Sequence, residues 1–447
     1  MSLKITVIGT GYLGATHAAA MAELGFEVLG LDVVLEKIEM LQRGEVPMYE
    51  PGLEDLLRKH VAGIEGSSGR LRFTMDWAEL AAFGDIHFVC VNTPQKHGEY
   101  ACDMSFVDAA IASLAPHLRA PSLVVGKSTV PVGSADRLAA YLAEHAPAGA
   151  DAELAWNPEF LREGFAVQDT LHPDRIVVGV RSDRAEKLLR EVYSTPVAEG
   201  TPFVVTDFPT AELVKTSANS FLATKISFIN AMAEVCEAAG GDVARLAEAI
   251  GYDDRIGKKF LRAGIGFGGG CLPKDIRAFM ARAGELGADQ ALTFLREIDS
   301  INMRRRGQMV EMAREALGGG SFLGKRVAVL GATFKPDSDD VRDSPALNVA
   351  GQIHLQGGQV TVYDPKGMEN ARRLFPTLGY AGSALQAVRG ADVVLHLTEW
   401  REFRELDPAE LGREAASRIV LDGRNALDPE LWRRAGWTYR AMGRPTA

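Results

Sequence analysis

The chain has 447 residues, enough for two or three domains, which excludes a single small binding module. Its 47% hydrophobic and 24% charged residues are typical of a globular protein and argue against disorder or a disulfide scaffold. The net charge of −10 disfavours binding to nucleic acid or anionic membranes, and no apolar run reaches the ~20 residues of a membrane span. We therefore expect a cytoplasmic protein that has neither nucleic acid nor a membrane as a partner.

A dinucleotide-binding pattern opens the chain. The β-branched run Lys4–Ile8 predicts a strand, and the Ala-rich stretch Ala15–Leu24 predicts a helix. Between them Gly9, Gly11 and Gly14 form a GxGxxG fingerprint, which allows a tight turn, close approach of the backbone to a pyrophosphate, and close packing of helix on strand. Alone this fingerprint is weak evidence, because glycine-rich turns are common.

The next apolar run strengthens the dinucleotide interpretation. Glu27–Leu31 ends in Asp32, about 20 residues beyond the fingerprint, where a carboxylate would bind the ribose 2′-hydroxyl and repel a 2′-phosphate. The alternative for Asp32 is an ordinary turn acid after a strand. The order of strand, fingerprint, helix, strand and acid predicts a site for NAD rather than NADP.

Further strands follow at 86–91, 123–127, 154–156 and 175–180. The first two run into loops 92–94 and 128–133, which we expect to line the cofactor crevice at the carboxyl ends of a parallel sheet. After the third run, Glu159 and Glu163 would lie one turn apart if that segment were helical. The alternative for these two acids is a solvated surface.

A long helix is predicted from Asp207 to Ala239 by apolar residues at helical spacing. Its length indicates a spine between domains or a dimer interface. Lys215 and Asn219 are four residues apart on it and therefore share a face. They form either a functional pair or a snorkelling lysine and a surface amide.

The segment Gly264–Asp275 combines many glycines with one cysteine, Cys271. So many glycines are costly in chain entropy, which favours a close approach of this backbone to another group; the alternative is a flexible loop. A thiol there can attack an aldehyde carbon if a cation lowers its pKa and donors hold the oxyanion. The other cysteines, Cys90, Cys102 and Cys236, form no CxxC pair or zinc-spaced cluster, so neither a metal site nor a disulfide framework is expected.

The remaining sequence predicts a second doubly wound domain. A helix over 292–317 and a glycine hinge at 318–320 precede strands at 326–331, 359–363, 392–397 and 418–421, with a helix over 345–355. This half has no GxGxxG, so a second dinucleotide is not expected. Its loop Phe334–Pro336, with Arg342 and Arg424, could hold a nucleotide phosphate or a partner loop; the alternative is exposed surface charge.

Seven ordered motifs together resemble the UDP-glucose/GDP-mannose dehydrogenase family nearly from end to end. They are the fingerprint, the segments 128–133, 157–164 and 215–225, the loop 266–275, and the second-half motifs 334–342 and 422–424. The resemblance implies an NAD-dependent, four-electron oxidation of the C6 alcohol of a sugar nucleotide to a carboxylate, through a cysteine thioester.

The resemblance also implies roles for individual residues. Cys271 would be the nucleophile, and Lys215 and Asn219 would stabilise oxyanions at C6. Asp275 would position a water, assist proton transfer and interact with Lys215, while Thr129 and Glu163 would support thioester hydrolysis. The residues expected to bind NAD are Gly9, Gly11, Tyr12, Leu13, Gly14, Asp32, Lys37, Thr93, Thr129 and Arg342. Those expected to bind the nucleotide sugar are Glu159, Phe160, Leu161, Arg162, Lys215, Asn219, Arg255, Phe260, Gly268, Phe334, Lys335 and Arg424.

The expected fold class is α/β, with two Rossmann-like doubly wound domains joined by a long central helix and a helical dimerisation region. We expect an NAD-binding domain over 1–205, a central helical, dimerisation and catalytic-loop domain over 206–318, and a UDP-sugar-binding domain over 319–447. The resemblance further implies a homodimer in which Arg255 reaches the neighbouring subunit's substrate. Segments 157–164 and 172–177 are most similar to the UDP-glucose branch of the family.

Three positions depart from the family pattern. Gly270 and Leu272 flank the cysteine where a serine and a phenylalanine are common, and Ala231 stands where a glutamate is frequent. None of these departures removes a proposed catalytic group.

Other functions stay open from the sequence. The substrate could be GDP-mannose, a UDP-N-acetylhexosamine or TDP-glucose. A two-electron dehydrogenase of the β-hydroxyacid type also pairs a dinucleotide domain with a Lys and Asn helix, but it needs neither Cys271 nor the second half. A non-catalytic nucleotide-sugar sensor would not need the set Lys215, Asn219, Cys271 and Asp275.

Overall fold

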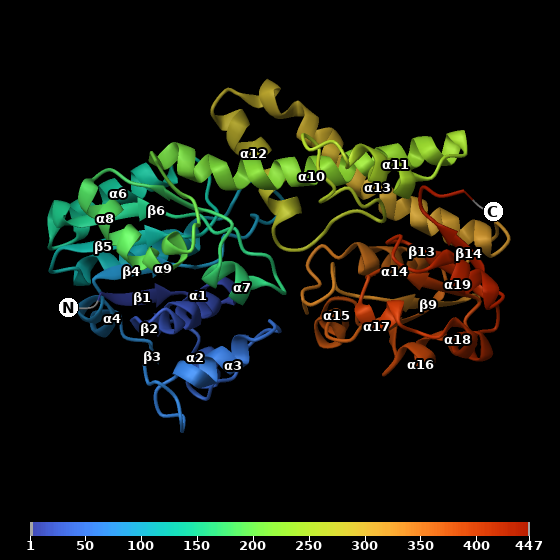
Figure 1. The fold of residues 1–447 in the computed structure, drawn as a ribbon, viewed down its shortest axis with the longest axis horizontal. Helices are drawn as coiled ribbons and strands as arrows, with labels where there is room; N and C mark the ends of the chain where they lie inside the picture. Colours follow the sequence, from blue (N-terminus) through green and yellow to red (C-terminus); the bar gives the residue numbers. More distant parts are fainter. Residues whose placement is uncertain (1–2, 446–447) are drawn as a thin grey trace. The chain divides into compact units, whose positions relative to one another are not determined.

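The computed structural model describes residues 3–445 and divides into two compact units (Figure 1). The first unit comprises Met1–Ala218 with Arg277–Leu286, and the second comprises Asn219–Ile276 with Gly287–Ala447. Each unit contains one sheet, which is mostly parallel in the first unit and parallel in the second. Along the chain, a long helix lies between the strands of the first sheet and those of the second. The predicted α/β class with two Rossmann-like sheets and a long central helix is confirmed.

The first unit contains an eight-stranded sheet with the order β3-β2-β1-β4-β5-β6-β7-β8. Neighbouring strands are parallel except β6 and β7, which are antiparallel. Its strands are β1 (Lys4–Ile8), β2 (Glu27–Leu31), β3 (Leu71–Thr74), β4 (Ile86–Val89), β5 (Ser122–Gly126), β6 (Ala152–Trp156), β7 (Ile176–Gly179) and β8 (Phe203–Thr206). The chain reverses its direction across the sheet between β1 and β4, which is where a doubly wound sheet binds its ligand.

Alternation of side chains explains why these apolar runs form central strands. In β1, Ile5 and Val7 face one hydrophobic core while Ile8 faces the other, and β5 divides Val125 and Val124 in the same way. Both faces of the sheet are therefore covered, as a parallel sheet requires. The strands β3 and β8 were not predicted. In β8, Val204 and Val205 are exposed, so this edge strand has no continuous buried run.

Helices flank the first sheet. They are α1 (Tyr12–Glu23), α2 (Leu35–Gln42), α3 (Leu53–His60), α4 (Trp77–Phe83), α5 (Ser105–Leu114), α6 (Ser134–His145), α7 (Ala166–Leu171), α8 (Asp183–Val192) and α9 (Ser194–Ala198), with 3-10 turns η1 (Ala115–His117) and η2 (Gly149–Asp151). The helix α1 begins at Tyr12, so the fingerprint's last glycine lies inside its first turn.

The second unit repeats the strand order of the first six strands. Its six strands lie in the order β11-β10-β9-β12-β13-β14, and all pairs are parallel. They are β9 (Arg326–Leu330), β10 (Gln359–Tyr363), β11 (Gly379–Tyr380), β12 (Val393–His396), β13 (Ile419–Asp422) and β14 (Thr438–Ala441). The sequence predicted four of these strands and missed the two at the edges, β11 and β14.

Two helices, α10 (Phe208–Ala239) and α12 (Leu272–Glu285), have residues in both units. The 32 residues of α10 confirm the predicted long helix. The other helices of the second unit are α11 (Val243–Ile250), α13 (Thr293–Ala316), α14 (Pro345–Leu355), α15 (Met368–Leu374), α16 (Ala384–Val388), α17 (Arg401–Arg404), α18 (Pro408–Glu414) and α19 (Pro429–Arg434), with the 3-10 turn η3 (Asp289–Leu292). Among the described residues, no helix has the length and apolar character needed to cross a membrane.

Candidate active site

The fingerprint turn between β1 and α1 has the geometry that a pyrophosphate site needs. Gly9 has a φ of 85°, in the left-handed region that favours glycine. A Cβ on Gly14 would lie 1.8 Å from the carbonyl oxygen of Gly9, so only glycine lets the helix pack this close to the strand. A Cβ on Gly11 would meet only Asn92 Oδ1, at 3.9 Å, which leaves this side of the turn open to a ligand. The turn therefore presents helix N–H groups to an anion.

Asp32 is fixed at the carboxyl end of β2. Its Oδ2 accepts hydrogen bonds from the backbone N–H of Thr10 at 2.9 Å and from the Thr10 hydroxyl at 3.1 Å, while Oδ1 accepts one from Val34 N at 3.1 Å. Lys37, also predicted to bind the cofactor, lies 3.6 Å from Oδ2. A carboxylate oxygen can accept two hydrogen bonds, so Oδ1 can still accept one from a ribose hydroxyl. This donor and acceptor set fits NAD.

Cofactor preference is expected to depend on the charge of Asp32. We expect kcat/KM to be at least ~10-fold higher with NAD than with NADP, about 1.4 kcal/mol, because a carboxylate repels the 2′-phosphate. The variant Asp32→Asn keeps the bond from Thr10 N and removes the charge, so the preference should narrow. Steady-state kinetics with both cofactors would measure this, and equal rates for the parent enzyme would contradict the assignment.

The ion pair between Lys215 and Glu159 lies in the first unit. Lys215 Nζ is 2.9 Å from Glu159 Oε1, and both side chains are mostly buried. The other oxygen of Glu159 accepts a hydrogen bond from the backbone N–H of Leu161 at 2.6 Å. The ring of Phe160 lies 5.6 Å below Lys215 Nζ and 3.9 Å from the guanidinium of Arg175. The predicted residues of this loop thus surround the one lysine that α10 supplies here.

The loop after β6 is not helical, so the condition under which Glu159 and Glu163 would share a helix face is not met. The loop instead uses side-chain acceptors for its backbone N–H groups. Glu50, which the sequence reading missed, is buried and accepts hydrogen bonds from Gly164 N and Ala166 N, both at 2.7 Å. Tyr12 also donates a short hydrogen bond to Glu50, and its pKa is raised by burial and by the negative charges of Glu50 and Glu163.

The other predicted residue of this loop, Arg162, has an ion-pair partner. Its Nε and Nη2 bind the two oxygens of Asp169 at 2.9 Å and 2.5 Å. This bidentate geometry fixes the guanidinium. Binding of a ligand to Arg162 through the same nitrogens would have to displace Asp169.

A buried lysine at the end of β5 was also missed. Lys127 Nζ donates a hydrogen bond to Asn157 Oδ1 at 3.0 Å, and Tyr193 donates to the same oxygen at 2.5 Å. Lys127 lines a cavity of ≈ 50 Å³ together with Asn157, Glu159 and Phe160. The pKa of Lys127 is lowered to about 8, mainly by burial; the positive charge of Lys215 adds to this lowering, while Cys90 and Glu159 oppose it. A lysine within the apolar run Leu123–Lys127 was the signal in the sequence.

The stability of the first unit is expected to depend on the protonation of Lys127. The folded pKa of about 8 lies below the ordinary lysine value of 10.5, so the unfolded state binds more protons between these pH values. Stability should therefore rise with pH across this window. The variant Lys127→Met should be more stable at pH 7 by about 1–3 kcal/mol and should lack this rise. Urea unfolding at several pH values, with the exposed Lys187→Met as control, would measure it; equal pH dependence of all three proteins would contradict it.

The loop that carries Thr129 is tied to its surroundings by side chains. Ser128 donates a hydrogen bond to Val91 O at 2.6 Å, beside the buried Thr93, which was predicted to bind the cofactor. The carboxylate of Glu212 on α10 accepts hydrogen bonds from Gly133 N and Ala135 N, both at 2.7 Å. Half-buried Thr129 therefore lies on a fixed loop at the carboxyl end of β5.

In the second unit, Asp275 connects two helices. Its Oδ2 accepts a hydrogen bond from Asn219 Nδ2 of α10 at 2.6 Å, and its Oδ1 accepts one from Lys274 Nζ at 2.6 Å. Asp275 is buried, whereas Cys271 is exposed. Cys271 directly precedes α12, and its carbonyl accepts the first intrahelical bond, from Asp275 N at 2.9 Å. Asn219, Cys271 and Asp275 thus lie together at the start of α12.

The glycines before Cys271 are explained by close packing, not by flexibility. A Cβ would lie 2.2 Å from Asn302 Oδ1 at Gly266, 2.3 Å from the Asp343 carbonyl oxygen at Gly268, and 2.8 Å from the Phe334 ring at Gly269. The predicted close approach is confirmed, and the groups that approach are the protein's own.

Polar side chains of the second unit hold the backbone of this glycine loop. Asn302 accepts a hydrogen bond from Phe267 N at 2.7 Å and donates one to Phe267 O at 3.0 Å. Arg306, which is buried on α13, donates to the same carbonyl at 3.1 Å and pairs with Asp343 at 2.7 Å. The sequence reading missed Arg306 because neighbouring arginines on an amphipathic helix look like a solvated face.

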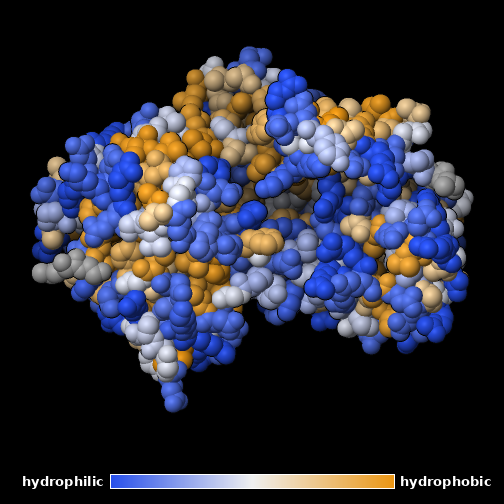
Figure 2. All heavy atoms as spheres, in the orientation of Figure 1, coloured by the Kyte–Doolittle hydropathy of each residue, from blue (hydrophilic) through white to orange (hydrophobic). Residues whose placement is uncertain are grey.

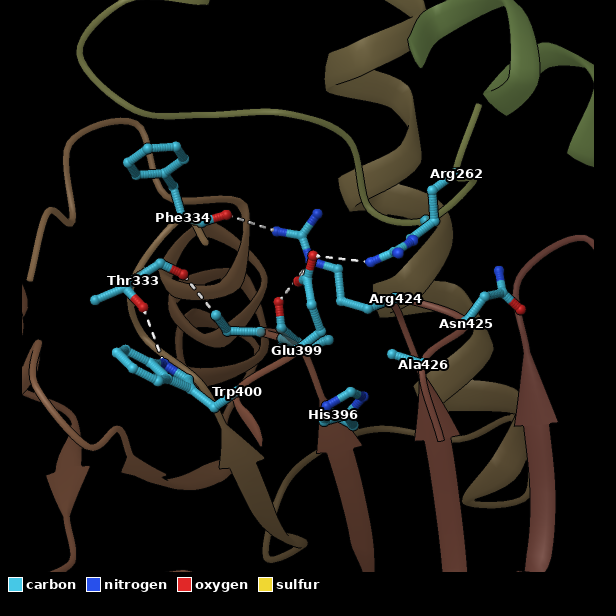
Figure 3. Close-up of polar contacts among 12 residues, drawn as sticks. Arg262, Thr333, Phe334, His396, Glu399, Trp400, Arg424, Asn425 and Ala426 are labelled. Atoms are coloured by element: carbon cyan, nitrogen blue, oxygen red, sulfur yellow. Dashed lines mark hydrogen bonds and ion pairs between the residues drawn. The ribbon is translucent and has the colours of Figure 1, made fainter. Parts of the chain in front are cut away.

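Arg424, predicted to bind the nucleotide sugar, holds three segments together (Figure 3). Its guanidinium donates hydrogen bonds to the carbonyl oxygens of Leu397 at 2.9 Å, Gly266 at 2.7 Å and Phe334 at 3.1 Å. Glu399 lies 3.5 Å from it and also 3.5 Å from Arg262. Three of its five N–H donors are therefore engaged by backbone carbonyls, so its main role in this structure is to position these loops.

The remaining predicted residues of the second unit are spread over several loops. Lys335 Nζ lies 5.6 Å from the ring of its neighbour Phe334 at the switch point after β9. Arg255 is exposed and forms a bidentate pair with Asp253. Phe260 is partly exposed and has a φ of 65°, which is unusual for a bulky residue.

The second sheet lacks the open acceptor found at Asp32. Asp364 ends β10 as Asp32 ends β2, but its oxygens accept hydrogen bonds from Ala332 N, Thr333 N and the Trp400 indole on one side. On the other side they accept from the N–H groups of residues 366 and 367. Asp364 therefore has no oxygen left open in the way that Oδ1 of Asp32 is, so the two Rossmann-like sheets differ at this position.

Comparison with known proteins agrees with this division. Residues 3–197 match the NAD-binding domain of the UDP-glucose/GDP-mannose dehydrogenase family, residues 209–304 match its central domain, and residues 328–429 match its UDP-binding domain. The chain belongs to this family. It is therefore an NAD-dependent dehydrogenase, and the sheet of its first unit belongs to the family's NAD-binding domain.

Individual relatives match along the whole length. A UDP-glucose 6-dehydrogenase of Rhizobium meliloti (strain 1021) is 41% identical over 99% of this chain and all of the relative. The structure of a UDP-glucose dehydrogenase from Pyrobaculum islandicum has a TM-score of 0.89 at 36% identity, covering 99% of this chain and 98% of the other. A UDP-D-ManNAc dehydrogenase from Pyrococcus horikoshii has a TM-score of 0.86 at 27% identity, with both chains fully covered.

Proposed function

We propose that this protein oxidises the C6 alcohol of UDP-glucose to the carboxylate of UDP-glucuronate, with two molecules of NAD and one of water per product. The observation that carries the proposal is the exposed Cys271 at the start of α12, beside the Asn219–Asp275 pair. A two-electron dehydrogenase has no use for such a nucleophile. The relative at 41% identity, a UDP-glucose 6-dehydrogenase, supports the choice of sugar nucleotide.

The proposed chemistry divides the oxidation into two parts around Cys271. NAD, when bound at the fingerprint turn, accepts a hydride from C6 in each part. After the alcohol has become an aldehyde, the Cys271 thiolate adds to its carbon, and the oxygen takes up a proton to give a thiohemiacetal. Loss of the second hydride and of the hydroxyl proton leaves a thioester. Water then attacks this thioester, releasing the carboxylate and the thiol.

The polar groups around Cys271 and on α10 would stabilise the charges that arise in these steps. Lys215 and Asn219 would bind the oxygen at C6 when it carries negative charge. Asp275, held by Asn219 and Lys274, would orient the attacking water and accept a proton. We propose Thr129 and Glu163 as further supports of the hydrolysis step.

Further residues are proposed to bind the nucleotide sugar. We propose Lys335 and Phe334 for the nucleotide, Glu159 to Arg162 for the sugar side, and Gly268 for close backbone contact. The proposed domain division is 1–205 for NAD, 206–318 for the catalytic and dimerisation region, and 319–447 for the UDP-sugar.

The number of NADH molecules per product tests the proposed function. With UDP-glucose, we expect two NADH for each molecule of carboxylate found by mass spectrometry. One NADH per product would instead indicate a two-electron dehydrogenase of the β-hydroxyacid type. Absence of any NAD turnover with a panel of sugar nucleotides would indicate a sensor.

We further propose that the protein works as a homodimer through α10. Phe221, Phe228 and Val235 are seven residues apart on this helix, and their side chains are 67%, 48% and 57% exposed. They therefore form an apolar stripe along one face, and hydrophobic residues show at the surface where the C-terminal part of α10 and α11 lie (Figure 2). A second copy would cover this stripe by a twofold contact.

Charging this stripe is expected to separate the subunits. Phe228→Asp should sediment as a monomer and lose most of its activity, because Arg255 is proposed to reach the neighbouring subunit's substrate. The control Leu355→Asp changes a residue that is 86% exposed on α14 and should stay dimeric. A parent enzyme that is fully active as a monomer at assay concentration would overturn the proposal.

A further inference from the structure

Arg342 lies directly against the residue that precedes Cys271. A Cβ built on Gly270 would be 2.3 Å from Arg342 Cζ, 2.5 Å from Nη1 and 2.6 Å from Nη2. Any residue other than glycine at position 270 would therefore displace this guanidinium. Gly270 departs from the family's common serine, so this chain makes room for a cation one residue away from its exposed cysteine.

A backbone hydrogen bond and a side-chain ion pair hold Arg342 in this place. Its carbonyl accepts a hydrogen bond from Gly269 N at 2.9 Å, which joins the Arg342 loop to the glycine loop. Its guanidinium binds Asp340 through Nε at 2.9 Å and through Nη2 at 2.7 Å. The guanidinium is therefore fixed beside the Gly270 Cβ position, with Nη1 and Nη2 at 2.5 Å and 2.6 Å from it.

The other charged groups of the second unit near Cys271 are largely paired with one another. On α12, Lys274 binds Asp275 at 2.6 Å. Arg306 of α13 pairs with Asp343 at 2.7 Å. Asp340 reduces the field of Arg342 but does not remove it, because Arg342 is fixed next to the start of α12. The dipole of α12 adds partial positive charge at the same place. Both effects favour a negative charge on Cys271 Sγ.

We propose that Arg342 stabilises the thiolate of Cys271 and so activates the nucleophile of this enzyme. The proposal rests on the proposed function for its meaning, because a thiolate is needed only if Cys271 attacks the aldehyde. The resemblance to the family had indicated Arg342 as a residue for NAD. Its packing on Gly270 gives it a role that needs no bound cofactor.

The reaction of Cys271 with iodoacetamide, without substrate or NAD, tests this proposal directly. Only the thiolate is alkylated, and the other three cysteines are buried, so labelling should occur at Cys271 as identified by peptide mass spectrometry. Arg342→Gln should slow alkylation at pH 7 by about tenfold, because a neighbouring cation shifts a pKa by about one unit or more. Near pH 10, where both thiols are ionised, the two rates should agree.

Two further variants separate electrostatics from loop structure. Arg342→Lys keeps the charge and should stay within about threefold of the parent at pH 7. Asp340→Asn removes the opposing negative charge and should accelerate alkylation. If Asp340→Asn acted only by disrupting the loop, it would instead slow alkylation, as Arg342→Gln does. The control Arg373→Gln makes the same charge change on an exposed arginine of α15 and should have the parent's rate.

The outcomes distinguish this proposal from the proposed function. If Arg342→Gln has the parent's alkylation profile, or if it is equally slow at pH 10, Arg342 does not stabilise the thiolate, whatever the enzyme oxidises. If the alkylation results are as expected but Cys271→Ser still forms the carboxylate, the electrostatic contact stands and the covalent mechanism falls. High salt should reduce the effect, because Arg342 is 61% exposed and its field is screened.

Discussion

Replacing Cys271 with serine is expected to abolish steady-state formation of the carboxylate. A serine hydroxyl fits the same space, but it does not ionise near neutral pH, so no covalent adduct forms after the first oxidation. Loss of a nucleophile commonly reduces kcat by about 10³-fold or more. Because Cys271 is exposed, the substitution should leave the free energy of unfolding unchanged.

Cys271→Ala should behave like Cys271→Ser, and both should bind the nucleotide sugar with nearly the parent's affinity in calorimetry. Turnover of either variant within about threefold of the parent would contradict the covalent mechanism. An aldehyde product or one NADH per enzyme in a single turnover would show that the first oxidation survives and that the second depends on the thiol.

The fold followed from the sequence where the local pattern and the tertiary environment agree. The runs that became β1 and β5 are apolar at successive positions because both faces of a parallel sheet are covered. Two glycines of the fingerprint meet a steric demand of the turn: Gly9 has a left-handed φ, and Gly14 packs on the carbonyl of Gly9. Edge strands such as β8 were missed because one side of them is exposed and their apolar pattern is short.

The candidate site was predictable as far as it consists of exposed or motif residues. Cys271 stood out by its glycine-rich loop and Asn219 by its spacing from Lys215, and the family resemblance implied that they act at one site. Buried ionic groups such as Glu50, Lys127 and Arg306 could not, because a charged residue is buried only when distant segments supply its partners. The same limit explains the glycine loop: the sequence predicted a close approach, but not that Asn302, Asp343 and Phe334 make it.

Arg424 shows how a family motif can be placed correctly and still change its meaning. The sequence resemblance gave it a phosphate or sugar to bind. In the structure it binds three carbonyls, so its charge supports the loops on which Gly266 and Phe334 lie. We propose that binding of the diphosphate also uses other cations of the second half, with Lys335 at the switch point of the sheet as the main candidate.

Substrate choice has the second large expected effect. We expect UDP-glucose to be oxidised with a kcat/KM at least ~100-fold above that of GDP-mannose, about 2.7 kcal/mol of discrimination in the transition state. A site shaped for uracil excludes the larger guanine, and polar groups paired by the correct base are left unpaired by the wrong one.

The decisive measurement is a competition between UDP-glucose, GDP-mannose and UDP-N-acetylhexosamines at equal concentration, read by product mass. At equal concentrations the product ratio equals the ratio of kcat/KM values, so differences in KM alone cannot mislead it. UDP-glucuronate should be the main product. A net charge of −10 does not attract a diphosphate, so a local cation has to bind it. Lys335→Met should therefore raise KM for UDP-glucose. The ratio of the products should change little, because the diphosphate is common to all the substrates. A mannuronate or an N-acetylated uronate as the main product would overturn the substrate assignment, while the fold and the chemistry of Cys271 would stand.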